Sequence, residues 1–238
     1  MSPKSYKRGY PVAVLIGIEQ NHAAIWQVFS QVAKHQQNIM LNDRNDPKTL
    51  YNFHEIIINA LRPILKEGIR SIIVASPAKT NYSHQFLNHI KGHHNWLLQG
   101  QGKTVFSPIT GSASTPTQVS VLTQTSMFKQ LISETTAEET ENLLEILEKR
   151  LNATDNLIHF SLQEAEHFIL EPQQEGKPKP EYLMLTDEYL SKSRQKYRVQ
   201  RLMQVAANNG VKTRVINAES TAGKRIAQFG GIICLAKP

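Results

Sequence analysis

The chain has 238 residues, of which 40% are hydrophobic and 20% charged, and its formal net charge is +7. This length and apolar content predict one large or two small packed domains and exclude a disordered chain. The single cysteine, Cys234, excludes an intramolecular disulfide framework and a metal site built from several cysteines. No apolar run approaches the ~18 residues of a membrane span, and the basic start of the chain lacks a convincing cleavage site, so we expect a cytoplasmic protein.

The first half of the chain predicts a hairpin followed by helices and strands. Two apolar runs, Tyr10–Ile18 and Ala23–Val32, flank a turn and predict paired strands. Residues 33–46 are polar and rich in Gln and Asn, so we assign them no regular element. The next predicted elements are a helix from Asp46 to Gly68, a strand at 70–76, a helix at 80–91, and strands near 96–98 and 104–106. A loop at 107–117 and helices at 116–132 and 136–151 follow. The last of these helices is predicted to begin with a capping box at Thr135 or Thr136.

The polar segment Asn152–Asn156 predicts a junction between two domains, residues 1–152 and 153–238. The second half then alternates between helices at 161–170, 192–208 and 221–229 and strands at 182–185, 211–216 and 232–236, with a polar loop at Pro172–Pro180. Glycines at position 210 and at positions 230 and 231 end two of these helices. The alternation predicts a layered α/β domain.

The segment Gly100–Thr104 resembles the end of a phosphate-binding loop, but the remaining features of that motif are missing. The position that requires its first glycine holds Leu97, and a β-type segment follows Thr104 where the motif needs a helix N-terminus. We therefore predict a flexible turn, and we include its Lys103 among the candidate RNA- or partner-contacting residues.

Four histidines, His84, His89, His93 and His94, lie close together in the sequence. His89 and His93 would share one helix face, which is a spacing that can place two ligands on one metal. No cysteine or acid lies nearby in the sequence, and we expect Gly92 to end the helix between them. We therefore predict no metal site, and we interpret His93 and His94 as part of a solvated surface that assists contact with RNA.

No catalytic centre is recognisable from the sequence. Gly111–Ser114 lacks the second glycine of a nucleophile elbow and has no strand pattern before it. Cys234 lies in the last apolar strand and is expected to be a core residue. We therefore expect neither enzymatic activity nor a cofactor.

The helix predicted at 192–208 has an apolar face of Val199, Leu202, Met203 and Ala206, with basic residues on the opposite side. Arg194, Arg198 and Arg201 fall within about 60° of one another at 100° per residue. The segment from Lys177 to Arg214 contains nine basic and three acidic residues. The three arginines either keep the protein soluble or bind an anionic partner such as ribosomal RNA or an acidic protein surface.

The C-terminal segments carry a family resemblance. Tyr182–Leu190, then Ala207–Val211, then Glu219–Ile233 with its ending Gly230-Gly231-Ile232-Ile233, resemble the third domain of the archaeal and eukaryotic peptide-chain release factor and its relative Pelota. The front of the chain is similar to the second domain of that family, through the helix with Phe53-His-Glu55 and the segment Ile72–Lys79. The resemblance implies a ribonuclease-H-like mixed-sheet domain followed by an L30e-like α/β sandwich.

Two departures from the family bear on function. Release factors carry Gly-Gly-Gln between the early strands and the first long helix, whereas Gln36–Lys48 contains no glycine, so we expect no hydrolysis of peptidyl-tRNA. Family members also begin with a decoding domain of over a hundred residues, whereas about ten residues precede the first strand here, so we expect that domain to be lacking.

The resemblance implies a Pelota-like, non-hydrolytic factor in ribosome rescue or mRNA surveillance. Its implied partners are the ribosome or ribosomal RNA, a translational GTPase and the ribosome-recycling ATPase, with no membrane partner. Two alternatives remain open: an RNA-binding protein that acts off the ribosome, and a hydrolase or nuclease with an unrecognised site.

Overall fold

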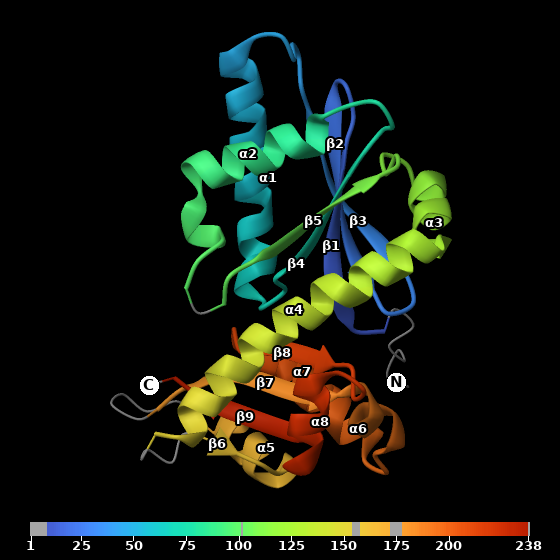
Figure 1. The fold of residues 1–238 in the computed structure, drawn as a ribbon. Helices are drawn as coiled ribbons and strands as arrows, with labels where there is room; N and C mark the ends of the chain where they lie inside the picture. The colour runs from blue at the N-terminus through green and yellow to red at the C-terminus, as the bar shows by residue number, and fades with distance from the viewer. Residues whose placement is uncertain (1–8, 101, 154–157, 172–177, 238) are drawn as a thin grey trace. The chain divides into compact units, whose positions relative to one another are not determined.

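The computed structural model describes residues 9–100, 102–153, 158–171 and 178–237. The chain divides into a central unit, Met1–Leu65 with Ile69–Glu139, and a C-terminal unit, Lys66–Gly68 with Thr140–Pro238. The change from one unit to the other falls within a single helix, α4 (Ser126–Leu151) (Figure 1). The predicted junction follows the end of this helix, and its residues 154–156 lie outside the described residues. None of the helices in the described ranges has the length and apolarity to cross a membrane.

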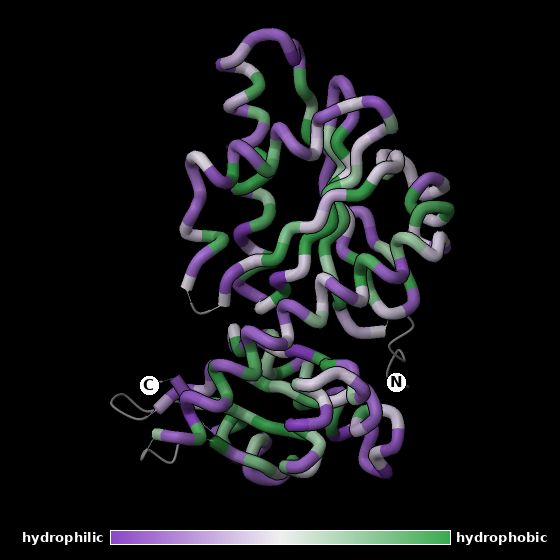
Figure 2. Tube along the Cα trace, in the orientation of Figure 1, coloured by the Kyte–Doolittle hydropathy of each residue, from purple (hydrophilic) through white to green (hydrophobic). Residues whose placement is uncertain are grey.

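The central unit is built on a mixed five-stranded sheet in the order β3-β2-β1-β4-β5. The predicted hairpin is confirmed: β1 (Pro11–Ile18) pairs antiparallel with β2 (His22–Phe29), which pairs antiparallel with β3 (Ala33–Met40). On the other side of β1, β4 (Ser71–Ser76) and β5 (Val105–Thr110) continue the sheet in parallel. Strands β1 and β4 are hydrophobic along their lengths because helices cover both faces of the sheet there (Figure 2).

Alternation along β1 sends its side chains into two separate cores. Val14, Ile16 and Ile18 pack with α1 (Pro47–Lys66) and α2 (Tyr82–His93) on one face of the sheet. Ala13 and Leu15 pack on the other face with α3 (Pro116–Gln124) and with Phe128 at the start of α4. The result is a three-layer α/β unit, which agrees with the mixed-sheet domain that the resemblance implied.

Several predicted elements of the central unit need correction. Residues 33–40 form strand β3, which the sequence analysis missed because only Ile39 of this polar edge strand is fully buried. Residues 95–97 form a short 3₁₀ helix, η1 (Asn95–Leu97), and not a strand, and β5 extends to Thr110 into the predicted loop. Helix α2 continues through Gly92 to His93, so Gly92 does not end it.

The two helices after β5 meet at Thr125 and not near residue 135. Thr125 has an extended backbone, and its hydroxyl accepts a hydrogen bond from the Phe128 backbone N–H at 3.2 Å. Thr135 and Thr136 lie inside α4, where their hydroxyls donate to the carbonyls of Leu131 and Ile132, so the predicted capping box there is wrong. Capping boxes form instead at Thr115, for α3, and at Ser161 in the C-terminal unit.

The C-terminal unit has a four-stranded sheet in the order β6-β9-β7-β8. These strands are β6 (Ile158–His159), β7 (Pro180–Thr186), β8 (Lys212–Ile216) and β9 (Ile232–Ala236). The other elements are α5 (Leu162–Leu170), α6 (Asp187–Lys192), α7 (Lys196–Asn208) and α8 (Thr221–Gln228). The predicted loop at Pro172–Pro180 lies outside the described residues between 172 and 177.

Both faces of this second sheet are covered by helices. Leu183 and Cys234 pack with α5 and α7, whereas their chain neighbours Met184 and Ile233 pack with α8 and with the last part of α4. This alternation gives an α/β sandwich. The predicted fold class, two α/β units with a mixed sheet in the first and a sandwich in the second, is confirmed.

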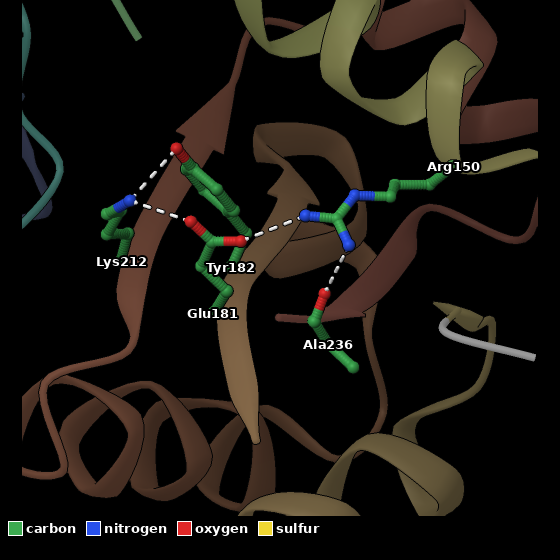
Figure 3. Close-up of polar contacts among 5 residues, drawn as sticks. All are labelled: Arg150, Glu181, Tyr182, Lys212 and Ala236. Carbon is green, nitrogen blue, oxygen red and sulfur yellow. Dashed lines mark hydrogen bonds and ion pairs between the residues drawn. The ribbon is translucent and has the colours of Figure 1, made fainter. Parts of the chain in front are cut away.

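A polar network attaches the end of α4 to this second sheet (Figure 3). Glu181 of β7 accepts from Arg150 at 3.1 Å and from Lys212 of β8 at 3.0 Å. Arg150 also donates to the carbonyl of Ala236 at 3.0 Å, and Lys212 donates to the hydroxyl of Tyr182 at 3.1 Å. Burial opposes the charge on Lys212, but Tyr182 and Glu181 outweigh it and raise the pKa of Lys212. We interpret the network as structural, because each of these charges has a partner of the opposite sign.

Candidate functional site

The three candidate arginines lie in different environments in the structure. Helix α6 ends at Lys192, because the backbone of Ser193 turns to φ −57°, ψ 129°, and α7 begins only at Lys196. Arg194 therefore lies in the turn between the two helices, and the predicted single helix over 192–208 is wrong. Arg198 lies on the flank of α7, where its guanidinium pairs with Glu166 of α5. The pairing raises the pKa of Arg198, and it gives this residue a partner inside the protein.

Arg201 remains on the solvent face of α7 and has an aromatic neighbour that the sequence analysis missed. Tyr197, one helical turn earlier, is 62% exposed. Residues at i and i+4 are neighbours on a helix surface, so Tyr197 and Arg201 share one patch. The sequence signal that could have identified Tyr197 is its position on the helix face opposite Val199, Leu202 and Ala206, all of which are buried.

We give the name α7 surface to Tyr197 and Arg201 together with two exposed cations at the start of the helix, Arg194 in the preceding turn and Lys196 in its first turn. Within the described parts of the chain, no ion pair is formed by Arg194, Lys196 or Arg201. An exposed tyrosine among unpaired cations can stack on a base or an aromatic side chain while the cations contact phosphates or carboxylates. The α7 surface is therefore suited to an anionic macromolecule.

In the central unit, His94 belongs to a cluster of side chains from two helices, and the sequence analysis missed the acid that completes it. Glu55 of α1 accepts hydrogen bonds through one carboxylate oxygen from His89 Nε2 at 2.8 Å and from His94 Nε2 at 2.6 Å. The side chains of His89 and His94 are 7% and 11% exposed, and that of Glu55 is 27% exposed. No acid lies near the histidines in the sequence, but Glu55 reaches them through the packing of α1 on α2.

Further rings surround His89. Its centroid lies 4.9 Å from each of the rings of Tyr51, His54 and His93. His93 is exposed, as predicted, whereas His94 is buried, so the prediction of a solvated surface is wrong for His94. The cluster joins the last turn of α2 to the middle of α1.

The electrostatics of the cluster favour the neutral form of His54 and His89 and the ionised form of Glu55. Burial lowers the pKa of His54 to about 4, with a further contribution from His89. Burial also lowers the pKa of His89 and outweighs the opposing effect of Glu55. For Glu55, burial opposes ionisation, but the hydrogen bonds from His94 and His89 outweigh it and hold the pKa below its usual value. Neutral imidazoles beside a carboxylate form the donor set that a transition metal ion prefers.

Lys103 lies apart from this cluster, in a pocket of about 450 Å³ in the central unit. His84, Lys91 and Lys103 line it together with Glu138. Thr104 leads directly into strand β5 and not into a helix, which agrees with the rejection of a phosphate-binding loop. Most of the lining is apolar, but its lysines outnumber its one acid, and we keep Lys103 as a candidate contact for an anionic partner.

The segment between β3 and α1, where the resemblance would place the release factors' Gly-Gly-Gln, is short and anchored. Only six residues, 41–46, connect β3 to α1, and they include no glycine. Arg44 donates to the carbonyls of Gln20 at 2.9 Å and Glu19 at 2.6 Å, and its guanidinium lies 3.9 Å from the ring centroid of Tyr82. The segment therefore lacks both the glycines and the glutamine of a hydrolytic loop.

Comparison with known proteins gives matches among solved structures. No protein-family model matches the chain, and a search of curated proteins gives no match. Archaeal Pelota, in a structure of its ribosome-bound form with ABCE1, is similar over 99% of this chain at 16% identity and a TM-score of 0.56. Dom34 of S. cerevisiae is similar over 99% of this chain at 19% identity and a TM-score of 0.50.

Dom34 is described as a translation termination-like factor involved in RNA quality control pathways and interacting with Hbs1. This chain covers 64% of the Pelota chain and 65% of the Dom34 chain, which is just under two thirds of their lengths. At this level of identity the similarity establishes the fold. The chain therefore has a Pelota-like fold, which matches the central and C-terminal domains of these proteins.

Proposed function

We propose that this chain is a Pelota-like translation factor that acts in ribosome rescue or mRNA surveillance without hydrolysing peptidyl-tRNA. The observation that supports this proposal most is the two-unit architecture, which is similar along 99% of the chain to ribosome-bound archaeal Pelota. The partners that we propose are the ribosome, a translational GTPase and a ribosome-recycling ATPase. The α7 surface supports contact with ribosomal RNA or with an acidic partner, because its cations are exposed and unpaired within the described residues.

The proposal that the factor is non-hydrolytic is supported by the anchored segment 41–46. Peptide release in the family depends on a flexible glycine backbone and a glutamine amide, and this segment offers neither. We expect the purified chain to release no labelled peptide from stop-codon complexes above background. Release at the rate of an authentic release factor would contradict this part of the proposal.

Co-sedimentation with ribosomes tests the proposed function directly. We expect the chain to sediment with ribosomes, and we expect the double variant Arg194→Ala/Arg201→Ala to bind more weakly and with a weaker salt dependence. If both side chains contact phosphates, the slope of log affinity against log salt should fall in magnitude by up to about 2. The variant should retain its fold, because the substituted side chains are exposed and surface changes typically cost within about 0.5 kcal/mol each.

A matched control removes the same charge from another part of the C-terminal unit. Lys224 and Lys237 are exposed residues outside the α7 surface, and Lys224→Ala/Lys237→Ala should leave ribosome binding unchanged. Equal loss in both double variants would mean that net charge and not the α7 surface determines binding. Binding to free RNA with no sedimentation on ribosomes would favour an RNA-binding protein that acts off the ribosome and would overturn the proposal.

A further inference from the structure

The cluster on α1 and α2 has the composition and the compactness of a metal site. One ligand atom each from Glu55, His89 and His94 lies within 4.8 Å of the other two. We propose that these three side chains bind a divalent transition metal ion of the zinc class. The inference is independent of the function proposed above, because it rests on contacts inside the central unit.

The ligand set and its spacing fit Zn²⁺. Two imidazoles and one carboxylate are a known three-residue zinc ligand set, which leaves the fourth position to water. With metal–ligand distances of about 2.0–2.2 Å, tetrahedral geometry places ligand atoms roughly 3.3 Å apart. The Nε2–Oε1 distances of 2.8 and 2.6 Å therefore need to widen by roughly 0.5 and 0.7 Å when the metal takes the place of the Nε2 protons and each imidazole carries its proton on Nδ1 instead.

The backbone on either side of the ligands is held by packing. Phe53 and Ile58 flank Glu55 on α1, and Phe86 and Ile90 lie beside His89 on α2, and all four are buried in one core. His94 follows directly at the C-terminal end of α2, where its backbone N–H donates to the carbonyl of Ile90 at 2.8 Å. A metal ion would thus find its ligands on fixed elements and would connect α1 to the end of α2.

A second observation is a buried polar atom without a partner in the ring that lies beside His89. His54 is 3% exposed, and its Nε2 has no hydrogen-bond partner among the described residues. Its ring centroid lies 4.9 Å from that of His89. A buried polar atom without a partner is unfavourable, and a water molecule on the fourth position of the metal is a partner of the kind that it lacks.

Metal binding by the full, untagged chain tests this inference. After treatment with a chelator and its removal, titration with ZnCl₂ should show one high-affinity site per chain. Titration with CoCl₂ should produce the visible absorption of a four-coordinate site. The variants Glu55→Gln and His94→Gln should weaken binding by about 100-fold or more, because each loses a direct ligand whereas loss of an outer-shell partner already costs 10–100-fold.

The matched control is His84→Gln. His84 lies on the same helix α2 but is exposed and takes no part in the cluster, so this variant should bind Zn²⁺ as the unchanged chain does. Circular dichroism establishes that each variant is folded, and Zn²⁺ should raise the melting temperature of the unchanged chain but not that of Glu55→Gln. Equal affinity in Glu55→Gln and the unchanged chain, or equal losses in the cluster variants and in His84→Gln, would overturn the proposal. Absence of a single tight site would mean that Glu55 serves only as a hydrogen-bond acceptor for the two histidines and would overturn the proposal as well.

Discussion

Gly17 of β1 illustrates how closely the backbone packs in the central unit. A Cβ atom at this position would lie 2.6 Å from the carbonyl oxygen of Ala113, which also accepts a hydrogen bond from the Trp26 indole at 2.7 Å. We expect Gly17→Ala to lower the free energy of unfolding by about 1–3 kcal/mol, because neither neighbour can move without a loss of packing. Both tryptophans, Trp26 and Trp96, lie in the central unit, so fluorescence during urea unfolding measures this change.

Gly92 provides the control for this substitution. It lies in helix α2, and a Cβ atom there would meet nothing within 4 Å. Gly92→Ala should therefore leave the central unit unchanged or stabilise it by up to about 1 kcal/mol, since alanine favours the helix. Equal destabilisation by the two substitutions would show that the contact with Ala113 is not the cause.

Cys234 of β9 is a single thiol inside the C-terminal core. Burial raises its pKa to about 12, whereas a thiol in an unfolded chain titrates near 8.5. We expect no reaction with a thiolate-specific reagent at about pH 8.5 until the C-terminal unit unfolds. Rapid labelling of the folded chain under these conditions would contradict the buried position.

The raised pKa of Cys234 determines whether the free energy of unfolding rises or falls with pH. The folded state keeps a proton that the unfolded state releases above about pH 8.5. This contribution to stability is therefore fully present below that pH and declines as the pH rises toward 12. Urea unfolding followed by circular dichroism at several pH values measures it, with Cys234→Ala as the variant in which the contribution is removed.

Among the elements, the end of α4 depends on Glu181 for its attachment to the C-terminal sheet. Glu181 is 22% exposed and bridges Arg150 and Lys212. Glu181→Gln should lower the free energy of unfolding by roughly 1–3 kcal/mol, because it removes two charge-assisted hydrogen bonds in a partly buried position. Labelling of Cys234 in urea is the measurement, since both residues belong to the same unit.

An exposed ion pair in the same unit serves as the control for Glu181. Glu188 pairs with Lys192 on α6, with side chains 47% and 76% exposed. Glu188→Gln should change stability by less than about 0.5 kcal/mol, because exposed pairs are screened by water. A larger effect of Glu188→Gln than of Glu181→Gln would contradict our interpretation of the network.

For the whole molecule, the course of α4 determines which fragment can fold. Leu143, Ile146 and Leu147 lie before the predicted junction, yet they are buried in the C-terminal core with Met184 and Ile233. A fragment of residues 140–238 should unfold cooperatively on its own, whereas residues 153–238 lack these three side chains and should expose that core face. Circular dichroism and urea unfolding of the two fragments measure the difference.

The predicted boundary near Asn152–Asn156 stays a prediction, and limited proteolysis tests it. Cleavage there would leave the last part of α4 on the N-terminal fragment. If the 153–238 fragment is as stable as the 140–238 fragment, the part of α4 after Glu139 does not contribute to the C-terminal core as we describe.

Much of the fold was predictable from the sequence because its signals are local. Strands such as Ile232–Ala236 are apolar runs, in this case preceded by two glycines, and the helices repeat apolar residues at helical spacing. The family resemblance likewise came from short segments, and the fold that it implied is confirmed. Where the signal was weak the prediction failed: β3 is a polar edge strand, and its pairing with β2 makes it a strand.

The sequence by itself determined the residue types of the candidate sites, and the tertiary structure decided which of them act together. Arg198 has the same local pattern as Arg201, but the packing of α5 beside α7 brings Glu166 to it and leaves Arg201 with Tyr197 in solvent. Glu55 lies 34 and 39 residues from its two histidines, so no local spacing could indicate the cluster. The physical reason is that helix periodicity sets which side chains share one face, whereas the faces that meet depend on how helices pack on a sheet.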